Sequence, residues 1–174
     1  MAAGNTYTPL ATTTLSSIAS SYTFSSISGS YTDLVLVASN LKSDTNDRGL
    51  KLQFNGDATT TYSDVALIGY NNTASTGKDT GVSFIQWAGF SIGLSTTGST
   101  GTIITNIFNY ANTTTYKNCL STASYKNNTL GPEVYYIAGL WRSTNAISSI
   151  VVSISGAGSF AVGSSFTLYG ILAA

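Results

Sequence analysis

Residues that could perform chemistry are few in this chain of 174 residues. The sequence contains no histidine and a single cysteine, Cys119. Without histidine, neither a Ser-His-Asp nor a Cys-His catalytic site can be built, and a His-ligated zinc or iron site is excluded. One cysteine cannot form a thiolate metal cage or an intrachain disulfide. Cys119 lies in a strand-like run with no basic cluster to activate it, so we predict a buried or half-buried, unreactive thiol.

Paired carboxylates remain as a route to an enzyme, in the manner of glycosidases. Most of the acidic residues stand at predicted turns or strand starts, where a carboxylate serves as an ordinary turn or capping group. They are Asp33, Asp44, Asp47, Asp57, Asp64, Asp79 and Glu133. We therefore predict a protein that is not an enzyme, with no catalytic residues, no cofactor and no metal site.

One acidic loop superficially resembles the start of a calcium-binding EF-hand. Its sequence, D-T-N-D-R-G from Asp44, has oxygen ligands at the first and third positions and glycine at the sixth. Arg48 then occupies the fifth position, and Asn55 stands where a bidentate glutamate is required. The sequence favours a solvated polar loop, and leaves open whether Asp44 and Asp47 bind calcium.

The aromatic residues allow a binding function. Nine of them could line a carbohydrate-stacking face, anchor a protein interface or simply fill the core: Trp87, Phe90, Tyr110, Tyr116, Tyr125, Tyr135, Tyr136, Trp141 and Tyr169. Core filling is expected for most of them. Tyr135 and Tyr136 are adjacent in a strand-like run, so one of the two must point outward.

Four residues are the interface candidates that this pattern predicts: Tyr135, Tyr136, Trp141 and Arg142. Arg142 is one of only two arginines, and it follows a bulky aromatic residue. Its guanidinium either binds a nearby carbonyl or carboxylate at the end of a sheet or anchors an interface.

Short strand-like runs separated by turn residues must position these side chains. Leu50, Leu52 and Phe54 alternate with polar residues, and Ile150, Val152 and Ile154 repeat the pattern. We predict nine to eleven strands, a long polar loop over 71–81 and a closing hairpin within 140–171. The fold class is all-β: a single-domain antiparallel β-sandwich, jelly-roll-like. Residues 1–21 form an N-terminal arm or a first edge strand, and 22–174 form the β-sandwich domain.

Composition limits the partners. Seven basic residues balance seven acidic ones, and charged residues make up 8% of the chain, against about 25% in an average protein. The balance argues against nucleic acid as a partner. No apolar run is long enough for a membrane helix, and we expect no membrane partner and no signal peptide. A low-charge, hydroxyl-rich surface is tolerable if much of it contacts other protein, which favours a homo-oligomer.

Several segments together resemble small virion proteins of tailed bacteriophages, of the kind found in cyanophage genomes. They are Y-T-F-S-S-I from Tyr22, Y-T-D-L-V-L-V-A-S from Tyr31, L-K-L-Q-F-N-G-D from Leu50, A-G-L-W-R-S-T-N-A-I-S-S-I from Ala138 and G-S-S-F-T-L-Y-G-I from Gly163. Each segment alone is weak evidence, while their order and spacing are fairly specific. The group has no catalytic motif to carry over.

The resemblance implies a non-enzymatic structural component of a virion, assembled in the host cytoplasm. The expected role is a capsid decoration (cement) protein that forms trimers and bridges subunits of the major capsid protein or other virion proteins. The alternative is a tail, tail-fibre or appendage protein, in which the predicted loops 71–81 and 127–132 contact the host surface or its glycans.

Overall fold

A computed structural model describes residues 6–45, 48–88, 100–127 and 131–172. It contains twelve strands: β1 (Tyr7–Thr14), β2 (Ser21–Phe24), β3 (Asp33–Leu41), β4 (Leu50–Phe54), β5 (Tyr62–Tyr70), β6 (Thr73–Val82), β7 (Ile85–Ala88), β8 (Gly101–Phe108), β9 (Lys117–Asn127), β10 (Gly131–Trp141), β11 (Ile150–Ile154) and β12 (Ser165–Ile171). Every pairing between them is antiparallel, and the described residues form no helix. The predicted all-β class is confirmed.

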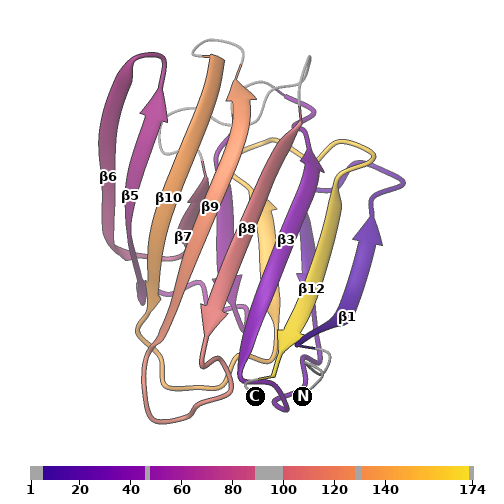
Figure 1. The fold of residues 1–174 in the computed structure, drawn as a ribbon, viewed down its shortest axis with the longest axis vertical. Coiled ribbons are helices and arrows are strands. Elements are labelled where there is room, and N and C mark those ends of the chain that lie inside the picture. Colours follow the sequence, from indigo (N-terminus) through magenta and orange to yellow (C-terminus); the bar gives the residue numbers. More distant parts are fainter. Residues whose placement is uncertain (1–5, 46–47, 89–99, 128–130, 173–174) are drawn as a thin grey trace.

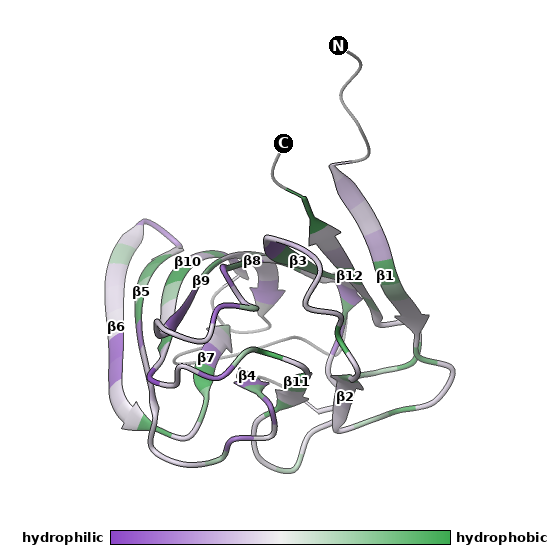
Figure 2. Cartoon of the chain, turned by 90° about the horizontal axis from the view of Figure 1, so that it is seen from below, coloured by the Kyte–Doolittle hydropathy of each residue, from purple (hydrophilic) through white to green (hydrophobic). Residues whose placement is uncertain are grey.

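The strands form two sheets that pack face to face. The larger has eight strands in the order β1-β12-β3-β8-β9-β10-β5-β6 (Figure 1), and the smaller has four in the order β2-β11-β4-β7. Figure 2 shows the small sheet lying against one face of the large sheet. Because the small sheet covers only that face, no second layer of the described strands lies on the opposite face of the large sheet.

The order of the strands is that of a jelly roll with additions. The strands β2 and β4 belong to the small sheet, and β3 and β5 belong to the large sheet, so the chain alternates between the sheets from β2 to β5. The chain also passes from the large sheet to the small one between β6 and β7 and between β10 and β11. If β1, β8, β9 and β12 are set aside, the other eight strands form two sheets of four in the order of a jelly roll, β3-β10-β5-β6 and β2-β11-β4-β7. The hairpin β8–β9 is inserted between β3 and β10, and β1 and β12 extend the sheet beyond β3.

The core lies between the sheets and follows from the period of two along each strand. Leu50, Leu52 and Phe54 on β4 are fully buried, while Lys51 and Gln53 between them are partly exposed. The inward residues of β11 and β12 behave in the same way: Ile150, Val152, Ile154, Phe166 and Leu168 are all buried. Because successive side chains of a strand point to opposite faces of the sheet, every second side chain lies in the core between the two sheets.

Two local predictions are wrong. The segment 140–171 is no hairpin, because β11 belongs to the small sheet and β12 to the large one, and the connection between them crosses the sandwich. The segment 71–81 is largely a strand, since Thr73–Val82 forms β6 and pairs along its length with β5. Residues 7–14 form β1, which pairs with β12 at the other edge of the large sheet.

Candidate interaction surface

The uncovered face of the large sheet, here called the outer face, carries most of the exposed apolar side chains. Of the twelve large apolar residues that are exposed in the described part of the chain, seven point outward from β5, β8, β9 and β10. They are Val65, Leu67, Ile104, Phe108, Leu120, Val134 and Tyr136. Contiguous exposed apolar surface of this kind marks sites of protein contact in soluble proteins.

Strand register sets these residues side by side. Leu67 on β5 is the direct partner of Tyr136 on β10, and Val65 is the partner of Ala138. The second row continues across the sheet, because Ala138 pairs with Leu120 on β9. Partners in adjacent strands have Cβ atoms about 4.5–5.5 Å apart, so the side chains touch. The result is a band of apolar contacts across three neighbouring strands.

A shallow hollow interrupts the outer face beside this band. Gly69 on β5 pairs with Ala74 on β6 and with Val134 on β10, so little side-chain volume stands above the backbone there. The hollow has a volume of about 570 Å³, and Leu67 and Tyr136 line one side of it. Leu67 and Tyr136 stand beside the hollow, so the face is not flat. An uneven surface of this kind can pack with shape complementarity against another protein.

The edges of both sheets, by contrast, are poorly suited to association. Pro9 and the bulge that follows it blunt β1, and β6 carries Lys78 and Asp79. One edge strand of the small sheet, β2, has only four residues. Proline, bulges, charges and shortness are the devices that prevent pairing at an edge. Association through a face therefore fits this molecule better than addition of a strand.

The structure separates the two adjacent tyrosines of the predicted interface. Tyr136 is 54% exposed and lies on the outer face, whereas Tyr135 is buried. The Tyr135 ring stacks on Tyr125 with centroids 5.4 Å apart, and its hydroxyl donates to Glu133 Oε2 at 3.1 Å. One of the pair points outward, as expected, and only that one is available to a partner.

Trp141 and Arg142 make hydrogen bonds within the chain. Trp141 is buried, and its Nε1 donates to Asp57 Oδ2 at 2.7 Å. Arg142 donates to the Thr60 carbonyl at 2.8 Å and to Ser63 Oγ. The first reading of Arg142, a guanidinium that binds carbonyl groups at the end of a sheet, is the one the geometry supports. Both side chains fasten the connection between β4 and β5.

Sequence reasoning missed most of the outer face, apart from Tyr136. The signal was present, because D-V-A-L-I from Asp64 and V-Y-Y-I from Val134 are apolar at successive positions. A strand of an antiparallel sheet with one solvated face reads apolar only at every second position. Apolar residues at both positions indicate that each face of the strand meets something other than water.

The thiol of Cys119 is buried, as predicted. Burial raises the pKa of this thiol to about 12. Because the thiolate is the reactive form, we expect alkylation by iodoacetamide at pH about 8 to be at least about 100-fold slower in the folded protein than in the unfolded one. Mass spectrometry of a labelling time course, with and without denaturant, measures this ratio. Equal rates in the two states would contradict the packing of β9 against the core.

The EF-hand-like loop is described at Asp44 but not at Asp47. Asp44 Oδ1 accepts the Ser159 backbone N–H at 2.6 Å, so this carboxylate ties the loop to the connection after β11. Asp47 lies outside the described residues. Among the described residues, no group of three or more Asp, Glu, His or Cys side chains is placed to hold a metal ion.

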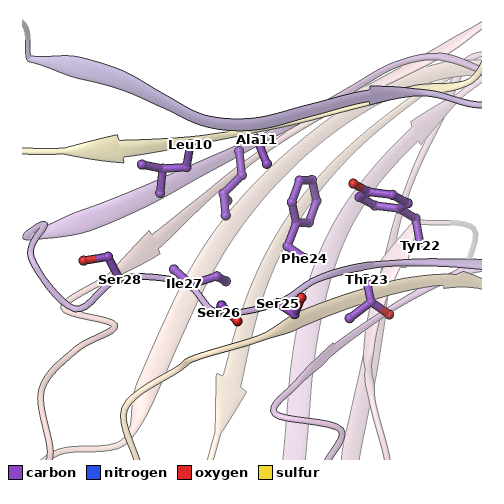
Figure 3. A pocket seen from close by; sticks show the side chains of 10 residues that line it. Leu10, Ala11, Tyr22, Thr23, Phe24, Ser25, Ser26, Ile27 and Ser28 are labelled. Carbon is purple, nitrogen blue, oxygen red and sulfur yellow. The ribbon is translucent and has the colours of Figure 1, made fainter.

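A cleft opens between the two sheets at the β1 side of the sandwich. Its volume is about 350 Å³, and no charged side chain lines it. Figure 3 shows Leu10 and Ala11 of β1 pointing toward Phe24 and Ile27 of the opposite segment. Leu10 is the unpaired residue of the bulge in β1, so two successive side chains point into the cleft. The cleft can accept an apolar group but offers no acid, base or nucleophile pair.

Comparison with known proteins adds no identification. No protein-family model matches the chain, and no curated protein or solved structure is significantly similar to it. The described residues also include no helix that is long and apolar enough to cross a membrane.

Proposed function

We propose that this protein is a structural, non-enzymatic subunit of a bacteriophage particle, a decoration protein that forms a closed trimer and stabilises the capsid. The observation that carries the proposal is the outer face, a broad apolar sheet surface with very few charges. The resemblance of the sequence segments to phage virion proteins is the reason for proposing a bacteriophage particle as the assembly. Jelly rolls occur in viral capsid proteins and in lectins, so the fold agrees with the proposal without deciding it.

Electrostatics supports a surface that is permanently covered. Along β10, the outward residues Val134, Tyr136, Ala138 and Leu140 are all uncharged, and Glu133 on the same strand is buried instead. A free monomer with such a face and a net charge of zero has little protection against aggregation. A second copy of the chain is the occupant that is present wherever the protein is made. The proposal therefore has each outer face covered by neighbouring copies in the trimer.

The alternative function, a tail or appendage protein that binds host glycans, has lost part of its basis. One of the two loops it relied on is the strand β6, with its backbone paired to β5. Of the second, residues 128–130 lie outside the described residues. The cleft at the β1 side of the sandwich, lined with hydroxyls and apolar groups, remains as a candidate glycan contact.

Two measurements test the proposed function. Light scattering on the purified protein is expected to give the mass of a trimer, with no smaller species at micromolar concentration. Quantitative mass spectrometry of purified particles is expected to give a copy number comparable to that of the capsid protein. A stable monomer contradicts the trimer, and a handful of copies per particle contradicts decoration. Binding of the isolated protein to a glycan array would favour the appendage function.

A further inference from the structure

Two carboxylates face one another at the β6 edge of the large sheet. Asp64 on β5 and Asp79 on β6 are direct register partners. Asp64 is 5% exposed and Val65 after it is 48% exposed, so the pair lies on the inward side of the sheet. Like charges directly opposite each other in neighbouring strands are destabilising. The pair therefore needs a physical explanation.

The oxygens of Asp64 are in unequal environments. Oδ2 accepts the Gln86 backbone N–H at 2.9 Å, while the buried Oδ1 has no hydrogen-bond partner. Burial raises the pKa of Asp64 to about 6, against the opposing effect of the Gln86 hydrogen bond, and the charge of Asp79 adds to the rise. A buried acceptor without a partner costs about 1–3 kcal/mol, and more when it is charged.

Among the described residues, no cation is found to act on Asp64. Lys78 precedes Asp79 but pairs with the outward-facing Val65, so it belongs to the other side of the sheet. Cys119 also lies near Asp64, and its thiol is neutral because burial raises its pKa. In the described part of the chain, no side chain supplies positive charge to Asp64.

We propose that Asp64 Oδ1 and the carboxylate of Asp79 bind a hydrated divalent cation of the Ca²⁺ or Mg²⁺ class. Such ions prefer carboxylate oxygens, and Mg²⁺ is commonly held by one or two carboxylates with water at the other positions. Asp79 is partly exposed, so water reaches the site from that side. The chemistry excludes soft metals, because the only sulfur nearby is a neutral thiol.

Binding at this position has a structural consequence. Among the described strands, β6 is the outermost one of the large sheet and pairs with β5 alone. Gln86, which donates to Asp64, is on β7 of the small sheet. A cation between Asp64 and Asp79 therefore joins the edge strand to its neighbour and, through Gln86, to the other layer.

Calorimetric titration of the whole protein with CaCl₂ and MgCl₂ tests the proposal, with KCl at matched ionic strength as the reference. With two protein carboxylates, we expect a Kd of about 10⁻⁴ to 10⁻³ M. Asp79→Asn is expected to weaken binding at least about tenfold, and Asp64→Asn to abolish it. Asp44→Asn removes one negative charge from the EF-hand-like loop, and it is the matched control that should bind as the unmodified protein does.

Two further readouts keep the result independent of folding defects. At about 10 mM cation we expect Tm to rise by roughly 3 °C in the unmodified protein and not in Asp79→Asn. Hydrogen exchange of the backbone amides in 73–82 should slow when the cation is added. The absence of both a binding heat and a Tm change at that concentration would overturn the proposal. So would loss of binding in Asp44→Asn alone, or Asp64→Asn and Asp79→Asn variants that still bind.

Discussion

The double variant Leu67→Lys/Tyr136→Lys is expected to convert the proposed trimer to a folded monomer. These partners are 63% and 54% exposed in the single chain, so lysine is tolerated there by the monomer. In an assembled interface the two ammonium groups would lose their hydration without gaining a partner, which costs several kcal/mol. We expect the association constant to fall by at least about 100-fold, which corresponds to about 2.7 kcal/mol.

Sedimentation velocity over a range of concentrations measures this change, and a thermal melt shows whether the monomer remains folded. Val162→Lys is the matched control, because Val162 is 58% exposed but lies in the connection between β11 and β12. That variant should remain a trimer. A double variant of Leu67 and Tyr136 that stays trimeric would show that the outer face is not the contact between copies.

Trp141→Ala is expected to cost the largest amount of stability of any single change described here. The indole is buried and stacks on the Tyr62 ring, with ring centroids 6.2 Å apart. Its centroid also lies 5.7 Å from that of the Phe54 ring. Replacement of a buried tryptophan by alanine typically lowers the free energy of unfolding by about 3–5 kcal/mol. Chemical denaturation gives this value directly. A loss below about 1 kcal/mol would mean that the β4–β5 connection does not depend on this side chain.

The hydrogen bond from Trp141 also couples stability to pH through Asp57. Burial alone would raise the pKa of Asp57, but hydrogen bonds from Thr59, Trp141 and Thr61 outweigh it and hold the pKa below its ordinary value of 3.8. A carboxyl group whose pKa is lower in the folded state stabilises the fold above its unfolded pKa, and this contribution is lost as the pH falls. The protein should therefore lose stability below pH about 4.

Asp57→Asn removes the ionisation and so should flatten this acid dependence. At neutral pH, a double-mutant cycle of Asp57→Ala with Trp141→Phe is expected to give a coupling energy of about 1–2 kcal/mol, because each single change removes one partner of the same hydrogen bond. Denaturation series at neutral and acidic pH measure both effects. An unchanged acid dependence in Asp57→Asn would assign it to other carboxyl groups.

Alternation along the strands was enough to predict the core and the fold class. Leu50, Leu52 and Phe54 are buried as expected, and the Asn55-Gly56 turn after them has positive φ at both residues. Alternation does not say which strands pair. The β11 and β12 patterns flank a glycine-rich segment as two strands of a hairpin would, yet they lie in different sheets. Only the long-range pairing of β12 with β3 and β1 decides this.

The candidate surface was harder to predict, for two reasons. The threonine, serine and glycine residues of 71–81 led to the prediction of a loop, but most of this segment is the strand β6. An edge strand with both faces in contact with water needs no apolar residues, so its composition resembles that of a loop. Large aromatic residues misled in the other direction. Trp141 looked like an anchor for a partner, but its N–H finds Asp57 inside the molecule, and a tryptophan with an internal acceptor is free to be buried.

The pairing of β1 with β12 governs how the large sheet forms as the chain is made. Tyr7 on β1 lies opposite Ile171 on β12, so segments far apart in the sequence lie side by side in one sheet (Figure 1). A ribosome makes β12 after all the other described strands, so β1 waits for its partner while β2 to β11 are made. A topology dominated by such distant pairings folds slowly. The strands that carry the outer face, β5, β8, β9 and β10, are all made before β12, so this face forms independently of the β1 edge of the sheet.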